Sequence, residues 1–324
     1  SAFDDCGITE ITLPGTLKRI GYKAFYDCDE LTSLSLNADE TDLVFLDEDG
    51  ECRTFDSCKN LVRLYLARNI SYKEGKEKAS PFYDSYFQQV IIDNTVTKLG
   101  QYMFQHSNKL KSMNIGTGIK SIPDNCFNDT EEVTQLNIVD SEEPITLGNS
   151  CRSFKAETLY IGRPISDLNN IPSGEKALTY VQFGNKIGIV TSDYFKDFPN
   201  LTNLILPKGI TVASNAFVNC GIQTIYGQGD ATFMTDAFKN CNKIEEVTVV
   251  GKLTLDERAF APADDAPAPK SLNVFFKEDP KNESHEKAFP EKYFKETTLN
   301  NLYDTPYQSV DFTHLPWVRK SSCS

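Results

Sequence analysis

Two short sequence motifs recur along the chain with the same regular spacing. Phe-x-x-Cys occurs at Phe3/Cys6, Phe25/Cys28, Phe55/Cys58, Phe217/Cys220 and Phe238/Cys241. An apolar triplet spaced Leu-x-x-Leu-x-Leu follows each of them within a few residues, as in ITEITL at 8–13 and LTSLSL at 31–36. A repeat of this kind predicts a solenoid, in which each unit is one coil stacked on the coil before it.

The middle apolar residue of the triplet measures the length of the unit. It marks eleven units, at Ile11, Leu34, Leu64, Val90, Met113, Leu136, Leu159, Val181, Leu204, Ile225 and Val247. Successive positions differ by 23, 30, 26, 23, 23, 23, 22, 23, 21 and 22 residues. A unit near 23 residues lies in the leucine-rich-repeat range of about 20–29.

The triplets predict strands. Alternation with a period of two indicates a strand with one buried face. Because a crossover separates each strand from the next, successive strands must pair in parallel. The predicted fold class is α/β, a right-handed leucine-rich-repeat solenoid with a parallel β-sheet on its concave face.

The second half of each unit predicts the convex wall, made of short helical or irregular turns and β-insertions. It reads KRIGYKAFYDC at 18–28, with degenerate copies at 97–107 and 120–130. We expect Gly21 and Gly100 at a turn position that needs positive φ. The Phe and the residue three positions later should share one side of a short helical turn that faces the core.

A longer similarity indicates an internal duplication near 41–118 and 142–209. Cys52-Arg53-Thr54-Phe55 matches Cys151-Arg152-Ser153-Phe154, and LYLARNIS at 64–71 matches LYIGRPIS at 159–166. Both blocks carry an insertion, at 41–51 and 142–149, which we expect to add a short edge strand or β-loop on the convex side and to serve as a contact loop. Arg68 and Arg163 end equivalent strands, where each would pair with an insertion carboxylate or offer a planar fork to an acidic ligand.

Leu-Pro, Ile-Gly-x-x-Ala-Phe and a following Cys together carry a family resemblance. Over about residues 1–260 the chain resembles the BspA-like leucine-rich-repeat surface proteins of host-associated anaerobic bacteria. The resemblance implies an extracellular, cell-surface role in adhesion, with host extracellular-matrix or bacterial surface proteins as partners. Glycans are a further candidate partner. It brings no catalytic residue with it.

The predicted domain organisation is a continuous solenoid over 1–260, followed by the last rungs and a C-terminal cap over 261–324. We expect further strands at 271–276 and 298–303, a short helix within 277–296, and a capping role for Trp317. The chain starts at Ser1 in the middle of a rung, and no secretory signal or transmembrane run is visible. An upstream signal is therefore expected to have been cut away or left out.

The net charge and the cysteine pattern exclude several classes of partner and site. With 46 acidic against 33 basic residues the net charge is −13, which disfavours nucleic acid as a partner. Ser107, Thr130 and Ala263 replace the recurring Cys, which indicates that this position favours a small buried side chain. We therefore do not expect a disulfide there. The chain lacks a zinc spacing and catalytic signatures, and Asp47 to Glu51 is better interpreted as a solvated turn than as a calcium loop. We expect no catalytic residue, metal or cofactor.

The concave strand face is the predicted binding surface, because residues between the buried triplet positions point outward. Its ligand-binding candidates are Tyr65, Ile91, Tyr160, Tyr180, Ile205 and Tyr226. Tyr160 and Tyr180 lie on neighbouring strands about 4.8 Å apart and are expected to form an aromatic patch. The alternative is that aromatic and β-branched residues simply favour strands.

The leading hypothesis is a non-enzymatic surface protein that mediates protein–protein contacts or cell adhesion. The alternative, from another class, is a structural spacer, since thirteen rungs would span about 60 Å. A carbohydrate-active enzyme is the least favoured, because it would need paired carboxylates in a cleft.

Overall fold

The computed structural model describes residues 2–256, 258–262, 272–276 and 297–301. The chain forms two compact units. Unit 1 holds residues 1–187 and 198–202, and unit 2 holds residues 188–197 and 203–324.

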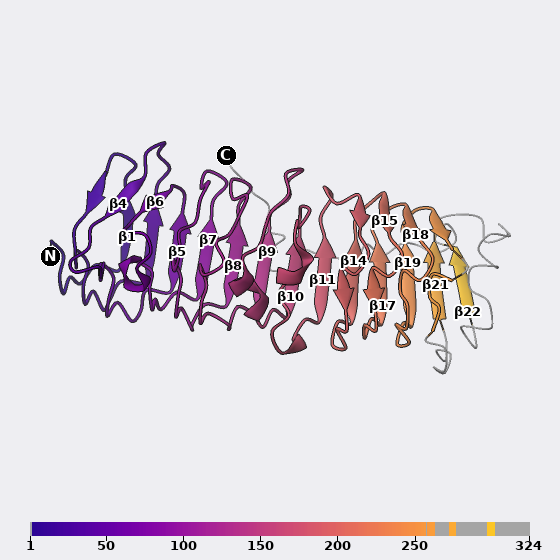
Figure 1. Cartoon of the computed structure of the whole chain (residues 1–324). Helices are drawn as coiled ribbons and strands as arrows, with labels where there is room; N and C mark the ends of the chain where they lie inside the picture. The colour runs from indigo at the N-terminus through magenta and orange to yellow at the C-terminus, as the bar shows by residue number, and fades with distance from the viewer. Residues whose placement is uncertain (1, 257, 263–271, 277–296, 302–324) are drawn as a thin grey trace. The chain divides into compact units, whose positions relative to one another are not determined.

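Unit 1 is built on a parallel sheet in which consecutive coils contribute one strand each (Figure 1). Its strands are β1 (Glu10–Leu13), β3 (Ser33–Leu36), β5 (Arg63–Leu66), β7 (Gln89–Ile92), β8 (Ser112–Ile115), β9 (Gln135–Ile138), β10 (Thr158–Ile161) and β11 (Tyr180–Phe183). A second sheet has the order β2 (Arg19–Ile20), β4 (Leu43–Phe45) and β6 (Ile70–Ser71). Short 3₁₀ helices occupy Glu77–Ala79, Asn149–Ser153, Leu168–Asn170 and Gly174–Lys176.

Unit 2 repeats this plan. Its main sheet has the order β14 (Asn203–Leu206), β17 (Thr224–Gly227), β19 (Glu246–Val249), β21 (Leu272–Phe276) and β22 (Thr297–Asn301). A second parallel sheet runs β12 (Ile189–Val190), β15 (Ile210–Val212), β18 (Ala231–Phe233) and β20 (Leu253–Leu255). A third sheet pairs β13 (Phe195–Lys196) with β16 (Phe217–Val218).

The predicted strands and their register are confirmed. In unit 1, Leu34 pairs in parallel with Ile11 on one side and with Leu64 on the other, and in unit 2 Ile225 lies between Leu204 and Val247. These middle residues are buried from Leu34 onward. Register is fixed because a slip by one residue would turn every buried side chain outward. The fold is thus a solenoid of stacked coils with a parallel main sheet.

The second strands correct the interpretation of the insertions. Leu43–Phe45 of the 41–51 insertion does form a strand, but it lies in the middle of its sheet rather than at an edge. In 142–149, Ile145 and Thr146 make only isolated bridges, to Ile165 and Ser121. Comparable strands such as Ile210–Val212 occur in unit 2 where the step is 21–22 residues. The second strand is therefore a normal part of the rung and not a product of the insertion.

Stacked phenylalanines run along the turns, and from Phe25 onward they are buried in the core. Ring centroids of Phe3, Phe25 and Phe55 follow one another at 5.1 and 5.5 Å, nearly parallel. In unit 2 the rings of Phe217 and Phe238 stack in the same way at 5.3 Å. Offset stacking at these separations adds to the gain from burial, which confirms that this Phe faces the core.

The turn that carries Phe-x-x-Cys differs from the prediction in two respects. It is not helical in the described residues, and the left-handed positions are not Gly21 and Gly100. Lys23 (φ 53°) and Tyr102 (φ 56°), two residues later, take positive φ. A Cβ at Gly100 would overlap the hydroxyl group of Tyr72, so the tyrosine side chain would have to shift.

A second left-handed residue stands immediately before the cysteine column. Asp5, Asp27, Ser57, His106, Asp129, Asn219 and Asn240 all have φ between 51° and 65°. Asp and Asn tolerate this region better than other side chains with a Cβ. The conformation turns the chain so that the next residue points inward.

The cysteine column is buried from Cys28 onward, as predicted, but it is more than a small filler. The thiol of Cys58 donates to the carbonyl oxygen of Phe25 one rung back, at 3.0 Å. Thr130 makes the same contact with the carbonyl oxygen of Phe104, at 2.6 Å. We call this set of X–H donors the donor column; its described members with such a bond are Cys28, Cys58, Ser107, Thr130, Cys220 and Cys241.

Towards the C-terminus the predicted strands at 271–276 and 298–303 are confirmed as β21 and β22. The expected helix within 277–296, Ala263 and Trp317 lie outside the described residues. Within the described ranges, no helix is long and apolar enough to cross a membrane.

Candidate functional site

The outward side chains of β7 to β10 in unit 1 form a surface without a charged residue. At the first position of each strand stand Gln89, Ser112, Gln135 and Thr158, and at the third position stand Ile91, Asn114, Asn137 and Tyr160. We call these eight side chains the neutral face. The amides were not predicted as binding residues from the sequence, where aromatic and apolar residues are the candidates; the signal that marks them is the missing charge in a chain whose charged fraction is 24%.

Charges reappear at one edge of the neutral face, where they pair with one another. Lys111 Nζ lies 3.1 Å from a carboxylate oxygen of Glu132, and Lys155 Nζ lies 3.0 Å from the other oxygen of that group. Lys155 also contacts Glu175 at 3.0 Å. These surface pairs add little stability, but they partly cancel the local field.

Tyr65 and Ile91 are Cα partners in the register of β5 and β7. Tyr65 is 37% exposed, and its hydroxyl group donates to Asp93 Oδ2 at 2.8 Å. Burial would raise the pKa of Asp93, but hydrogen bonds from the Thr95 amide, Tyr65 and the Thr95 hydroxyl outweigh it and hold the pKa below its usual value. Tyr65 is thus fixed at its tip with its ring at the surface.

Tyr160 and Tyr180 lie on the neighbouring strands β10 and β11, as predicted. The hydroxyl group of Tyr160 donates to Asp140 Oδ1 at 2.8 Å. Burial and then this hydrogen bond raise the pKa of Tyr160, so its hydroxyl group stays protonated at neutral pH. Tyr180 donates to Gln182 Oε1 at 3.4 Å. The expected aromatic patch between the two tyrosines stays a prediction.

The two candidates in unit 2 differ from each other. Ile205 and Tyr226 are Cα partners on β14 and β17. Tyr226 is partly exposed, but Ile205 is only 5% exposed, so the expectation that it stands uncovered on the outer column is wrong. In the same outward column, Gln182 of unit 1 and Thr248 of unit 2 are also buried.

Arg68 and Arg163 are structural. Both side chains are fully buried. Arg68 donates to the carbonyl oxygens of Gly15, Leu17 and Thr41 at 3.0, 3.0 and 2.7 Å, and it lies 3.8 Å from Asp39, which precedes the insertion.

Arg163 donates to the carbonyl oxygens of Gly116 and Thr117 at 2.9 and 3.1 Å, and burial lowers its pKa. Each guanidinium thus satisfies loop carbonyls of earlier rungs. Neither arginine presents its fork to an acidic ligand.

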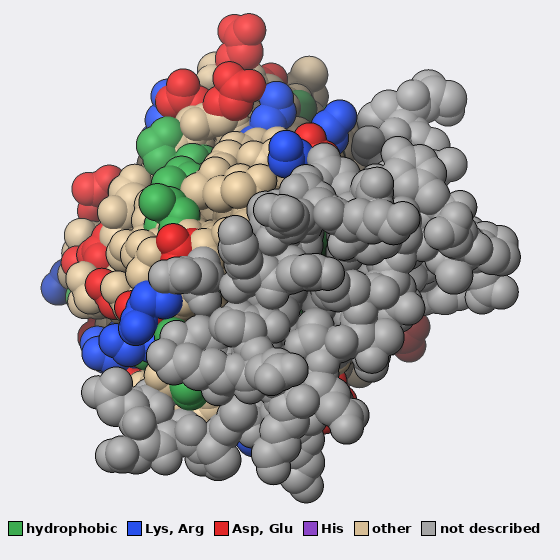
Figure 2. All heavy atoms as spheres, turned by 90° about the vertical axis from the view of Figure 1, so that its right-hand side faces the viewer, with side chains coloured by type: hydrophobic (Ala, Val, Ile, Leu, Met, Phe, Trp, Pro, Cys, Tyr) green, Lys and Arg blue, Asp and Glu red, His purple; other side chains and the backbone are tan. Residues whose placement is uncertain are grey.

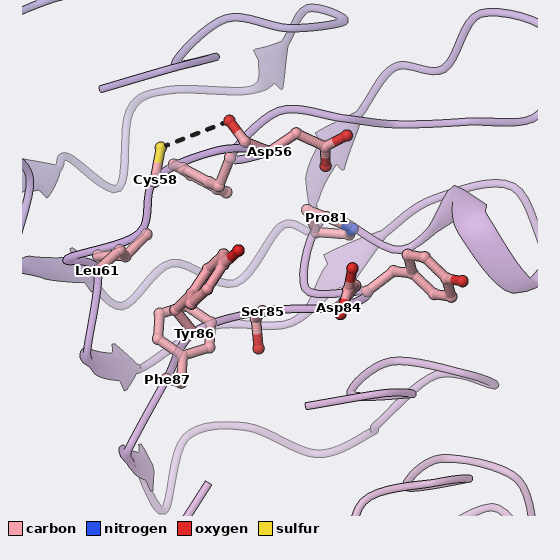
Figure 3. Close-up of a pocket in the computed structure, with 10 residues that line it drawn as sticks. Asp56, Cys58, Leu61, Pro81, Asp84, Ser85, Tyr86 and Phe87 are labelled. Carbon is pink, nitrogen blue, oxygen red and sulfur yellow. Dashed lines mark hydrogen bonds between the residues drawn. The ribbon is translucent and has the colours of Figure 1, made fainter. Parts of the chain in front are cut away.

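A small pocket opens beside the turns of two successive rungs (Figure 3). Asp56, Cys58, Asp84, Ser85 and Tyr86 are among its lining residues. Burial raises the pKa of Cys58 to about 12, so its thiol is protonated at neutral pH and is a poor nucleophile.

The acidic turn predicted at 47–51 is held by contacts within the protein. Asp47 Oδ2 accepts a hydrogen bond from the amide of Gly50 at 2.9 Å and lies 3.5 Å from Lys73 Nζ. No grouping of three His, Cys, Asp or Glu side chains that would hold a metal ion occurs in the part of the chain that the structure describes. Figure 2 shows acidic and basic side chains interspersed on the described surface in that view.

The fold and the repeated rung define a repeat protein of the leucine-rich class. A family model described as "BspA type Leucine rich repeat region (6 copies)" matches residues 1–72, 49–154 and 173–264. The chain belongs to this family. The family is described by its repeat, and no curated protein matches the chain.

Several solved structures are similar to this chain at low sequence identity. A leucine-rich repeat protein from Bacteroides ovatus is 17% identical, with 90% of this chain and 84% of that chain covered and a TM-score of 0.33. One from Eubacterium ventriosum is 14% identical over 74% and 78%, with a TM-score of 0.32. A leucine rich cell surface protein from Faecalibacterium prausnitzii is 15% identical over 90% and 79%, with a TM-score of 0.25.

Proposed function

We propose that this protein is a non-enzymatic recognition module of a bacterial cell surface, which mediates adhesion through the outward faces of its main sheets. In this proposal the main sheet forms the concave side of right-handed coils, and the turns and second sheets form the convex side. The partners are host extracellular-matrix proteins or surface molecules of other bacteria. The location outside the cell rests on membership in the BspA type family.

The observation that carries the proposal is the contrast between the two sides of each strand. The inward residues repeat with little change, while the outward residues vary from rung to rung and include tyrosines. Two of them, Tyr65 and Tyr160, are oriented by hydrogen bonds to Asp93 and Asp140. Tyrosine offers a large contact area with a polar end and is enriched at interfaces.

The buried thiols also favour binding over catalysis. The pKa of Cys52 is raised to about 11 and that of Cys58 to about 12, chiefly by burial, so neither supplies a thiolate near neutral pH. A solenoid, by contrast, offers an extended surface that is suited to large partners.

The test is a binding screen of the purified chain against matrix proteins, bacterial cells and glycans, at low salt and at about 0.15 M salt. Saturable binding that persists at the higher salt, and that a Tyr65→Ala/Tyr160→Ala/Tyr226→Ala variant weakens, supports the proposal. The matched control is Tyr86→Ala, because Tyr86 is exposed at 36% but lies before β7 and outside the strand columns. Absence of binding to every component would favour the spacer hypothesis.

A further inference from the structure

The fold itself permits charged side chains at the outward positions of the main sheet. Other strands carry a charge at the same first position: Glu10 on β1, Arg63 on β5 and, in unit 2, Glu246 on β19. All three are exposed. Charge is thus tolerated at the first outward position, yet β7 to β10 carry none at either outward position, and neither does β11 next to them, although charged side chains are otherwise favoured at the surface.

The polar groups on this face have unused hydrogen-bonding capacity. The Oδ1 atom of Asn137 and the Oγ1 atom of Thr158 are buried from solvent and have no hydrogen-bond partner among the described residues. They belong to the adjacent strands β9 and β10. An unpaired buried polar atom costs about 1–3 kcal/mol, and a ligand hydroxyl group recovers this only when the side chain turns towards the surface on binding.

The backbone of the neutral face is not available to a partner. Each of its strands pairs in parallel on both sides, so its amide and carbonyl groups are consumed in the sheet. A peptide adds a strand only at an open edge. A folded protein would need a central cluster of apolar anchors, and this face offers only Ile91 and Tyr160.

Charge excludes a second class of ligand. A sulfated or sialylated chain needs cations, and the nearby Lys111 and Lys155 are already paired with Glu132 and Glu175. Amide side chains both donate and accept, which matches the hydroxyl groups of an uncharged sugar. The Tyr160 ring adds apolar surface for the C–H face of a sugar, while its hydroxyl group is held by Asp140.

We propose that the neutral face binds an uncharged glycan chain laid across β7 to β10. The repeated amides lie on strands about 4.8 Å apart, a spacing close to the length of one sugar residue in an extended chain. This inference rests on the proposed recognition function and names the ligand class of one surface.

The experiment titrates the full chain with neutral oligosaccharides of glucose, mannose, galactose and N-acetylglucosamine, with sialylated and sulfated glycans and unglycosylated matrix peptides alongside. We expect saturable binding of a neutral oligosaccharide that changes little between low salt and about 0.15 M salt. Asn137→Asp keeps the shape but adds a charge and removes the amide donors, and it should weaken this binding about tenfold. Asn114→Asp, on the adjacent strand β8, should act in the same direction.

The matched control is Asn185→Asp, because Asn185 is exposed in unit 1 but lies outside the neutral face. It should bind as the unchanged protein does, and circular dichroism with thermal unfolding checks that all variants are folded. Preference for sulfated or sialylated glycans, binding of no neutral oligosaccharide, or an unaffected Asn137→Asp variant would each overturn the inference. Retained binding to a surface protein in those cases would leave the proposed function standing.

Discussion

Replacing Thr130 by valine tests whether the donor column stabilises the solenoid through its hydrogen bonds. The two side chains have nearly the same shape, so the substitution removes the hydroxyl group and leaves the packing. Thr130 Oγ1 donates to the carbonyl oxygen of Phe104 at 2.6 Å and accepts from the amide of Ser107 at 3.1 Å. A cysteine at this position should be tolerated, because Cys58 makes the equivalent bond.

The structure also sets the size of the effect. The amide of Ser107 has a second acceptor, the carbonyl oxygen of Phe104, at 3.2 Å, so neither group is left without a partner. The cost is therefore the net value of a hydrogen bond, about 1 kcal/mol, and not the larger penalty of an orphaned group.

Urea unfolding at constant m-value measures this difference. Thr16→Val is the control, since Thr16 is an exposed threonine in the same unit. If Thr130→Val were as stable as the unchanged protein while the control also showed no effect, the hydrogen bonds of the donor column would not stabilise the fold, and only the size of its side chains would matter.

Three further predictions concern single side chains. Arg68→Met should destabilise unit 1 by about 1.5–3 kcal/mol more than Arg163→Met, because Arg68 makes one more charge-assisted hydrogen bond. A higher urea midpoint for Arg68→Met than for Arg163→Met would contradict this. Ser57→Gly should raise stability by about 0.5–1 kcal/mol, since Ser57 has φ 65°, and a lower thermal midpoint would refute this. Tyr65→Phe should raise the pKa of Asp93. The depressed pKa of Asp93 stabilises the folded protein at pH values above the pKa of an unfolded aspartate, about 3.9, and this stabilisation is lost at lower pH. The stability lost in Tyr65→Phe should therefore be present at pH 7 and shrink below about pH 3.9. NMR titration measures the pKa and urea unfolding measures the stability across this range.

The repeating part of the fold was predictable from the sequence because one constraint recurs on every rung. Leu34, Leu64 and Val90 follow the apolar triplet, and the structure pairs them in the expected register. The burial of Cys28 and Cys58 was equally visible from their column. The donor role of that column had a signal too, since Ser and Thr share with Cys an X–H group that donates.

Other features were hidden because their signals are short. Ile210–Val212 is a strand of three residues, too brief for alternation to distinguish it from a turn. The left-handed positions at Asp27 and Asn219 were marked only by a preference for Asp and Asn before the column. The exposure of outward residues was not predictable at all: Ile91 and Ile205 occupy the same column with the same side chain, yet only Ile205 is fully buried.

The two sides of a rung should therefore respond to mutation separately, and β9 with its preceding turn offers both in one coil. Thr130 belongs to the donor column and Asn137 to the neutral face. Because the contact of Thr130 lies in the core, Thr130→Val should lower the free energy of unfolding without changing glycan binding. Asn137→Ala removes the amide without adding a charge at this partly buried position, and it should weaken binding with little effect on stability, since the Oδ1 atom makes no internal hydrogen bond. If the double variant showed coupling in either quantity beyond about 0.5 kcal/mol, the core and the outward face would not be independent, and the neutrality of β7 to β10 would have to be explained by folding after all.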